Sequence, residues 1–312
     1  MGGSKLLAGV VDLELSVHHR VQRPLIGLDQ ASLLDVAVDA VEEVRALAEG
    51  EVSAVGFGIP CLFDQRTGQA VIAVNLPLAD IMFGEVMAER LGMPVFVDND
   101  ANMAALAEHR AGAAVGCSDV VLLTIGTGIG GGLILGGELY RGAIGAAGEL
   151  GHIVIDMNGP RCQGNCPNRG CLEAMASGTA LAREAARVAR ERHDSRLAEA
   201  AADGLELVGP LVTELAYDGD EAAVDVLALI GTRLGVGITG LVNAFNPQVV
   251  VIGGGVMAAG DFLLEPARAE VAARALPPSR DEVRIVTAEF GVEAGMVGAA
   301  AMAFDSLAAG VR

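Results

Sequence analysis

The stretch from residue 151 to residue 171 reads GHIVIDMNGPRCQGNCPNRGC and holds three of the chain's five cysteines. Nine, three and four residues separate its metal-ligand types, in the order His152, Cys162, Cys166 and Cys171. Three thiolates and one imidazole complete the tetrahedral shell of Zn²⁺, and the glycines and prolines between them allow a loop to fold around an ion. The spacing therefore predicts a structural zinc site with no open coordination position.

Two other uses of these residues are weaker. A catalytic cysteine–histidine pair needs one thiol and not three. Disulfides persist in oxidising compartments, whereas we expect a cytoplasmic protein whose thiols stay reduced. The other two cysteines, Cys61 and Cys117, stand alone in the sequence and are expected to be small buried hydrophobic residues.

A second cluster of polar residues lies in VFVDNDAN, residues 95–102. The apolar run predicts a buried strand, and the polar groups at its end are Asp98, Asn99, Asp100 and Asn102. Ligands of open α/β sheets collect at the carboxyl ends of strands. One Asp or Asn would suffice as the N-cap of a following helix, so four polar groups exceed that need. We interpret the segment as part of a functional site, with a helix cap as the alternative.

Glycine-rich turns follow two other predicted strands, in TIGTGIGGG (124–132) and IGGGV (252–256). Without side chains, such turns let backbone amides approach an anion closely, and Thr124 and Thr127 add hydroxyl donors. A flexible hairpin turn is the alternative, although it would need only one or two glycines. The chain has neither a P-loop motif nor a dinucleotide fingerprint. Together with the carboxylates at the strand end, the two turns indicate a nucleotide site.

These groups need elements to position them, and short apolar runs alternate with helical patterns along the chain. Strands are expected at 52–59, 93–100, 119–126, 130–137, 248–256 and 283–290. Helices are expected at 78–91, 101–111, 176–193, 220–244, 261–275 and 293–308. The strands at 119–126 and 130–137 should pair. This alternation favours an α/β fold with largely parallel sheets.

Composition excludes several classes of protein. The formal charge is −19, with ten aromatic residues and no tryptophan, so the chain should repel nucleic acid and offers few groups to stack on bases. The longest uncharged run, Leu234 to Gly260, contains asparagines, a proline and a glycine turn. A bilayer would penalise that polar backbone, so we expect a buried helix and then a buried strand, with no membrane partner. No secretory signal is apparent at the start of the sequence.

Taken together, these motifs resemble the ROK family of sugar kinases and repressors, and in particular its bacterial glucokinases. GGSK (2–5) resembles the family's first phosphate loop, DNDAN (98–102) its catalytic segment, and TIGTGIGGG its second phosphate loop. GELGH (148–152), the cysteine cluster and LEAMASG (172–178) resemble its sugar-and-zinc signature, and IGGGV its nucleotide-side turn. The resemblance spans nearly the whole chain.

The resemblance implies an actin-like, ribonuclease-H-type ATPase fold of two α/β lobes with a cleft between them. We expect a small lobe at 1–114, with the last helix (293–312) packing back on it. The large lobe should span 115–292 and include the zinc loop. A homodimer or a higher homo-oligomer is also expected.

The resemblance also implies roles for individual residues. Asp100 would be the general base that takes the proton from the 6-hydroxyl of a hexose. The sugar would be bound by Gly58, Asn99, Asp100, Glu149, His152 and Glu173. ATP would be bound by Gly2, Gly3, Ser4, Lys5, Thr124, Gly126, Thr127, Gly128, Gly254 and Gly255, with Mg²⁺ as its counterion. His152 would serve both zinc and sugar, so that the metal fixes the position of a sugar ligand.

The chain departs from the family pattern in two places. The family's cysteines are spaced C-x-C-x₄-C, so the two additional residues between Cys162 and Cys166 predict a reshaped loop that keeps its zinc. The family also has a strand and an aspartate ahead of its first phosphate loop, where this sequence has Met1. Lys5–Asp12 resembles the second strand of a hairpin, so we expect its partner to precede it in a longer chain. Without that aspartate, phosphoryl transfer should be weak.

The function expected from the sequence is ATP-dependent phosphorylation of a hexose, with glucose as the substrate, at the 6-hydroxyl. A sugar-sensing transcriptional regulator of the same fold is the alternative from another class, although its DNA-binding extension is not seen and the charge is acidic. A sugar-binding pseudokinase is the third interpretation. Polyphosphate as donor is disfavoured because no basic track is present.

Overall fold

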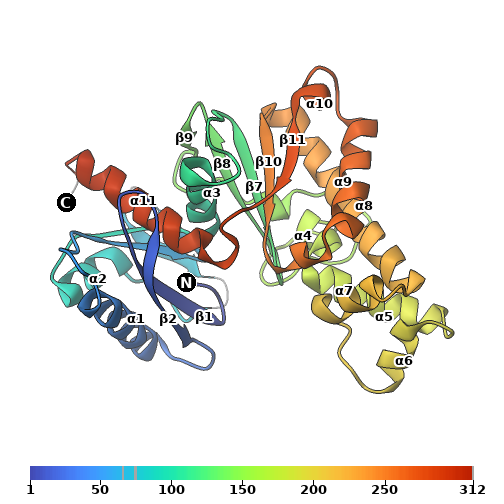
Figure 1. Ribbon diagram of the computed structural model, residues 1–312, viewed down its shortest axis with the longest axis horizontal. Helices are drawn as coiled ribbons and strands as arrows, with labels where there is room; N and C mark the ends of the chain where they lie inside the picture. Colours follow the sequence, from blue (N-terminus) through green and yellow to red (C-terminus); the bar gives the residue numbers. More distant parts are fainter. Residues whose placement is uncertain (65–66, 74–75, 311–312) are drawn as a thin grey trace. The chain divides into compact units, whose positions relative to one another are not determined.

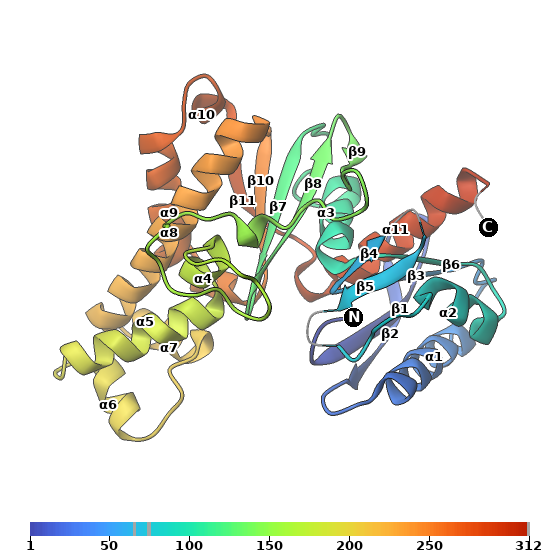
Figure 2. The ribbon, with the colours of Figure 1, turned by 180° about the vertical axis from the view of Figure 1, so that it is seen from behind.

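The computed structural model describes residues 1–64, 67–73 and 76–310, and Figures 1 and 2 show its ribbon from two sides. Its strands are β1 (Lys5–Val11), β2 (Val17–Pro24), β3 (Val55–Ile59), β4 (Cys61–Asp64), β5 (Gln69–Ala73), β6 (Val95–Asn99), β7 (Val120–Ile125), β8 (Ile129–Leu135), β9 (Glu138–Leu139), β10 (Val249–Gly253) and β11 (Arg284–Thr287). Its α-helices are α1 (Gln30–Ala46), α2 (Phe83–Leu91), α3 (Asp100–Ala111), α4 (Leu172–Ala176), α5 (Gly178–Glu191), α6 (Arg196–Ala202), α7 (Gly209–Tyr217), α8 (Glu221–Phe245), α9 (Asp261–Arg274), α10 (Ser279–Glu282) and α11 (Ala294–Ala308). Short 3₁₀ turns are η1 (Leu150–His152), η2 (Gly255–Ala259) and η3 (Gly291–Glu293).

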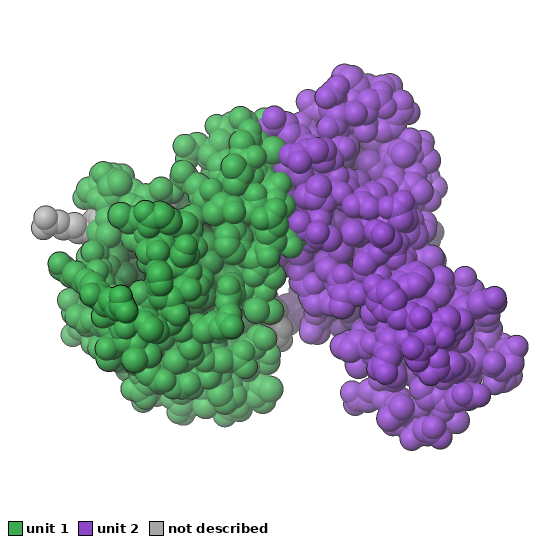
Figure 3. Space-filling view, in the orientation of Figure 1, with its two compact units in different colours: residues 1–122, 132–148, 288–312 green, residues 123–131, 149–287 purple. Residues whose placement is uncertain are grey.

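The described residues form two compact units (Figure 3). Unit 1 comprises the described residues of Met1–Leu122 and Gly132–Gly148, together with those from Ala288 onward. Unit 2 comprises Leu123–Gly131 and Glu149–Thr287. The lobe limits expected from the sequence, 1–114 and 115–292, stay a prediction. Residues 311–312, which the expected last helix included, lie outside the described part of the chain.

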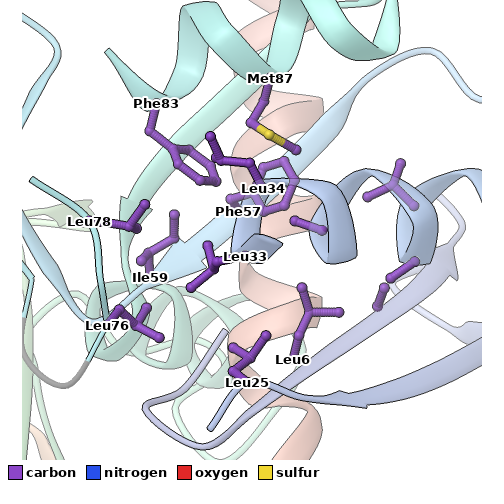
Figure 4. Close-up of a cluster of buried hydrophobic side chains, with 14 of the residues drawn as sticks. Leu6, Leu25, Leu33, Leu34, Phe57, Ile59, Leu76, Leu78, Phe83 and Met87 are labelled. Carbon is purple, nitrogen blue, oxygen red and sulfur yellow. The ribbon is translucent and has the colours of Figure 1, made fainter. Parts of the chain in front are cut away.

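The first core of unit 1 forms where α1 covers β1 and β2. Asp29 caps α1, its carboxylate accepting a hydrogen bond from Ser32 N at 2.8 Å. Apolar residues then recur three and four positions apart along α1, so that one face of the helix is buried against the strands. Figure 4 shows two of these residues, Leu33 and Leu34, within the cluster of buried side chains. Phe57 and Phe83 close this core edge to face, with ring centroids 5.2 Å apart. Burying one such large apolar side chain contributes about 1.5–3 kcal/mol.

The pairing of β1 corrects one expectation. β1 is hydrogen-bonded antiparallel to β2, which follows it in the chain, with Leu6 opposite Arg23 and Ala8 opposite Val21. The partner was expected to precede it. The sequence VHHRVQRP of β2 alternates partly buried with exposed positions but carries few apolar side chains. A strand of that composition lacks the alternation of apolar residues that identifies strands in a sequence.

A second layer of unit 1 positions the strand end at residue 99. β3 and β6 are parallel, with Gly58 opposite Asp98. α3 begins directly after β6 and packs against α11, as both ribbon views show. The two helices approach closely because residue 298 is glycine: a Cβ atom there would lie 1.7 Å from the carbonyl oxygen of Met103. α11 also contacts β3, where Gly56 makes similar room for Ala299.

Glu108 holds three segments of unit 1 together. Its side chain is fully buried at 0% exposure, and no ion pair to it is found among the described residues. One carboxylate oxygen accepts from Ala113 N at 2.9 Å, and the other accepts from Glu289 N and Phe290 N, both at 2.9 Å. These backbone donors replace the water that a buried carboxylate loses. The segment that enters unit 1 after β11 is thus tied to the end of α3.

One five-stranded sheet has the order β11-β10-β7-β8-β9, with β10 and β11 parallel. β7 and β8 are neighbours, as predicted for 119–126 and 130–137. In unit 2, α8 and α9 pack closely where Gly231 faces the carbonyl oxygen of Leu263. α8 is long and apolar enough to cross a membrane by length and composition, but most of its apolar window is buried in the protein. A buried helix followed by a buried strand was the expectation, and α8 and β10 confirm it.

Candidate functional site

The polar segment at the end of β6 divides into three different roles. Asn99 is the N-cap of α3, and its side-chain oxygen accepts from Ala101 N at 2.9 Å and Asn102 N at 3.2 Å. The helix-cap interpretation therefore holds for Asn99. Asp98 is buried in an ion pair with Arg141. Asp100, the first residue of α3, is left with a hydrogen bond to its carboxylate from Ala101 N at 3.0 Å.

The carboxylate of Asp100 has the environment that a general base requires. Burial raises the pKa of the Asp100 carboxyl above its ordinary value, while the Met1 ammonium and the Ala101 amide partly oppose that rise. A base whose pKa is raised accepts a proton more readily than an ordinary aspartate. Asp100 can therefore take a proton from a bound hydroxyl.

Gly58 lies beside this segment, because β3 places it opposite Asp98. A Cβ at this position would come within 3.0 Å of Met103 Cγ and 3.3 Å of Gly295 O. The carbonyl oxygen of Gly58 accepts a hydrogen bond from the Met1 amine. Unit 1 thus brings together Gly58, Asn99 and Asp100 from the predicted sugar-binding set.

In unit 2, the predicted zinc ligands converge. The ligand atoms of His152, Cys162, Cys166 and Cys171 all lie within 4.8 Å of one another. Cys162 Sγ is 3.5 Å from His152 Nδ1, and Cys166 Sγ is 3.8 Å from Cys171 Sγ. In a tetrahedral Zn²⁺ site with Zn–S of about 2.3 Å, two sulfurs lie about 3.8 Å apart, and a sulfur and a nitrogen about 3.5 Å apart. The donor set and both distances fit zinc.

The protonation of the thiols also fits a cation. Burial, reinforced by the neighbouring thiols Cys171 and Cys166, raises the pKa of the Cys162 thiol. Burial likewise raises the pKa of Cys171. Three thiols this close together, two of them buried, cannot all ionise without a compensating positive charge, which coordination to a metal would supply. Nδ1 of His152 faces the cysteines, and the other ring nitrogen, Nε2, lies 3.8 Å from Glu149 Oε2.

Glu173 links the zinc cluster to the second predicted phosphate loop. Its Oε1 lies 3.8 Å from Cys162 Sγ, and its Oε2 accepts a hydrogen bond from Ile129 N at 2.9 Å. Gly128 makes room for this carboxylate, since a Cβ there would lie 2.2 Å from Glu173 Oε2. Sequence patterns predicted both groups but not their contact, because the two segments are 44 residues apart.

The loop between β7 and β8 is a tight turn held by the start of α5. Gly126 N donates to Gly128 O at 2.9 Å, and Gly178 N donates to Gly126 O at 2.8 Å. The hydroxyl of Thr179 donates to Thr127 O at 2.8 Å. Thr127 is exposed at the tip of the turn, and Thr124 is partly buried on β7. Thr179 was not predicted; its place directly after a Ser-Gly helix start was the available signal.

The second glycine turn lies against the first. Gly254 has φ of +95° and ψ of 170°, a conformation essentially restricted to glycine. A Cβ on it would lie 2.2 Å from Ile125 O, at the end of β7. Unit 2 therefore groups Thr124, Gly126, Thr127, Gly128, Gly254 and Gly255. In unit 1, the loop Gly2–Lys5 turns before β1, with Gly2 N donating to Lys5 O at 2.8 Å.

Replacing Gly254 by alanine is expected to destabilise the protein by about 1–3 kcal/mol, because the added methyl group meets a backbone carbonyl in a backbone conformation that disfavours it. Because the sequence predicts a nucleotide site at this turn, the affinity for a nucleotide should also fall as the turn moves. For stability alone, Gly255→Ala is the matched control, since a Cβ there meets nothing within 4 Å. Thermal unfolding and nucleotide kinetics of both variants test this; equal unfolding temperatures for the two would contradict it.

Comparisons with known proteins agree with these motifs. The model of the ROK family matches residues 1–306. A glucokinase of Halalkalibacterium halodurans is 37% identical over 94% of this chain and 80% of its own length. A xylose repressor of Bacillus spizizenii is 29% identical over 97% of this chain and 75% of its own. A crystal structure of a ROK family glucokinase from Streptomyces griseus, in complex with glucose and AMPPNP, is 33% identical, covers 97% of this chain and 96% of its own, and superposes with a TM-score of 0.85.

Proposed function

This chain belongs to the ROK family, and from that membership we propose that it is an ATP-dependent kinase that phosphorylates glucose at the 6-hydroxyl. The two-lobed actin-like fold is that of its structural relatives. The observation that carries the proposal is Asp100, a partly buried carboxylate at the start of α3 whose raised pKa suits a base. The glucokinase structure that contains glucose and AMPPNP supports the choice of both substrates.

In the proposed reaction, Asp100 accepts the proton of the sugar's 6-hydroxyl as that oxygen attacks the γ-phosphorus of ATP. The new O–P bond forms while the bond from the γ-phosphorus to the bridging oxygen breaks, and ADP leaves. Phosphoryl transfer depends mostly on positioning and on neutralising charge. Asn99, whose side chain caps α3, and Gly58 on the adjacent strand would hold the sugar beside Asp100.

Glu149, His152 and Glu173 would bind the other sugar hydroxyls, because carboxylates and imidazole form paired hydrogen bonds with such groups. His152, Cys162, Cys166 and Cys171 would hold one zinc ion, which supplies rigidity and no reacting bond. With Nδ1 of His152 bound to the metal, its Nε2, which lies near Glu149, would be left to hydrogen-bond the sugar in one fixed tautomer.

The phosphates of ATP would be bound by backbone amides and hydroxyls of three turns. These are Gly2–Lys5 with its lysine, the turn Thr124–Gly128, and the pair Gly254 and Gly255. Mg²⁺ would neutralise the β- and γ-phosphates. Lys5 is exposed and is the chain's single lysine, so its ammonium is available to a phosphate.

Replacing Glu149 by glutamine is expected to raise the KM and the Kd for glucose about 10–100-fold, because hydrogen bonds to a charged acceptor contribute about 1.5–3 kcal/mol. The KM for ATP should stay nearly unchanged. Glu138→Gln, at an exposed position on β9, is the control. Calorimetric titration with glucose and steady-state kinetics are the measurements; an unchanged glucose affinity would remove Glu149 from the sugar site.

A sugar-sensing regulator is the second candidate, favoured by the similarity to a xylose repressor over 97% of this chain. A coupled assay with several hexoses and with ATP or polyphosphate as donor separates the two. A kinase of glucose shows transfer from ATP with the highest kcat/KM for glucose. Sugar binding with no transfer from either donor would refute the kinase and favour the regulator. The expected homo-oligomer and cytoplasmic location stay predictions.

A further inference from the structure

The ion pair between Asp98 and Arg141 is the most enclosed charged contact near the proposed base. Asp98 is 5% exposed, and its Oδ2 accepts from Arg141 Nε at 2.6 Å. Its Oδ1 accepts from Asn99 N at 2.7 Å and from Asn102 Nδ2 at 2.9 Å. Asp98 therefore accepts three hydrogen bonds from groups of the protein, out of about four that a carboxylate can accept. Its negative charge is compensated by a residue 43 positions away.

Asn102 is a second side chain that binds the Asp98 carboxylate. Asn102 is 1% exposed, and its amide nitrogen is turned towards the Asp98 carboxylate. Its own Oδ1 is buried and finds no donor within the described part of the chain. A buried acceptor without a partner costs free energy. Asn102 therefore stabilises one orientation of the Asp98 carboxylate, although its own side-chain oxygen has no donor among the described residues.

Arg141 is the first residue of the irregular loop Arg141–Gly148. The segment Arg141–Gly148 has no helix or strand, and the three glycines in it, Gly142, Gly145 and Gly148, all have positive φ. Arg141 closes the loop with its own backbone, since its carbonyl oxygen accepts from Ala147 N at 3.1 Å. The loop leaves β9, which lies beside α3 in both ribbon views, and runs directly into Glu149.

We propose that Arg141 is a positioning residue for hexose binding, which anchors the loop Arg141–Gly148 to the strand end that carries Asp100. The side chain ties the loop to Asp98, two residues before Asp100, and the carbonyl fixes the loop's far end. The segment that leads into Glu149 thereby keeps a defined position relative to Asp98 within unit 1. This proposal rests on the proposed function, because it assigns Glu149 to the sugar.

The test compares Arg141→Gln, Asp98→Asn and the double variant, with Arg141→Lys as the conservative change. Arg110→Gln is the matched control, because Arg110 also forms an ion pair in unit 1, with Asp305 at 2.7 Å, and lies on α3. The measurements are the glucose Kd by calorimetry without nucleotide, kcat and both KM values, and the unfolding temperature. A purely structural pair would lower the unfolding temperature and leave the hexose constants of the folded enzyme unchanged.

Each single variant is expected to raise the glucose Kd and KM about 10–100-fold, because a displaced Glu149 loses its charge-assisted hydrogen bond to the sugar, while the KM for ATP changes less than about twofold. The double variant should be no worse than either single variant, since the two residues act through one contact. Arg141→Lys should recover part of the affinity. Hexose and ATP constants that rise together, additive single effects, or an equal effect of Arg110→Gln would overturn the proposal.

The calorimetric titration with glucose distinguishes a failure of this proposal from a failure of the proposed function. If the wild-type protein binds glucose without transferring phosphate, the kinase is refuted and the glucose Kd still decides the role of Arg141. If it binds no hexose at all, both are overturned, because Arg141 would have no hexose ligand to position.

Discussion

Replacing Asp100 by asparagine is expected to lower kcat by about 10²–10⁴-fold, the usual contribution of a positioned general base. The amide keeps the size of the side chain but cannot take the proton of the 6-hydroxyl. Glucose affinity, measured by calorimetry, should change little. Asp261→Asn is the matched control, since Asp261 is the first residue of α9 as Asp100 is of α3, but it is exposed.

The pH dependence of the wild-type enzyme provides a second readout for the same residue. Burial raises the pKa of Asp100, and the base works in its ionised form. Activity should therefore be full above that pKa and be lost as the pH falls through it, at a pH above the ordinary aspartate value of about 3.9. The residual activity of Asp100→Asn should lack this acid limb. An asparagine variant with near wild-type turnover and the same acid limb would show that another group is the base.

Replacing Cys166 by serine is expected to remove zinc and weaken glucose binding together. Protein purified without added zinc should contain one zinc ion per chain in the wild type and much less in the variant, by elemental analysis. Because His152 would be held by the metal on one side and face the sugar on the other, the glucose Kd should rise about 10–100-fold, as when an outer partner of a metal site is lost. The unfolding temperature should also fall.

Cys117→Ser controls for the loss of a thiol as such. Cys117 is buried in unit 1 and is not among the four clustered ligands. Its replacement should leave the zinc content unchanged. A zinc-free Cys166→Ser protein that binds glucose as well as the wild type would separate the metal from the sugar and refute the link through His152.

Local chemistry was predictable from the sequence where the residue type itself limits the role. Three cysteines and one histidine at short spacing have few uses other than a metal site, and the structure brings them within 4.8 Å of one another. The α/β alternation was also predictable, because buried strands such as β10 and long apolar helices such as α8 carry strong periodic signals. The start of α2 was expected at 78 but lies at Phe83, where the preceding Met82 provides no side-chain cap.

Contacts between distant segments were not predictable. Four polar residues at the end of β6 looked alike in the sequence, and only the start of α3 at Asp100 separates the cap Asn99 from the proposed base. The partner of Asp98, Arg141, lies 43 residues away and has no motif of its own. β2 was missed because its polar sequence resembles a loop, and its pairing depends on the turn that follows β1.

The most direct test of the account is to identify the product formed from glucose and Mg-ATP. Phosphorus and carbon NMR of the reaction mixture should show glucose phosphorylated on the 6-oxygen and ADP in equal amounts, and Asp100→Asn should form them at about a hundredth of the rate or less. Glucose that binds but stays unphosphorylated, or a phosphate on another hydroxyl, would contradict the assignment of this chain as a kinase that uses Asp100 to activate the 6-hydroxyl.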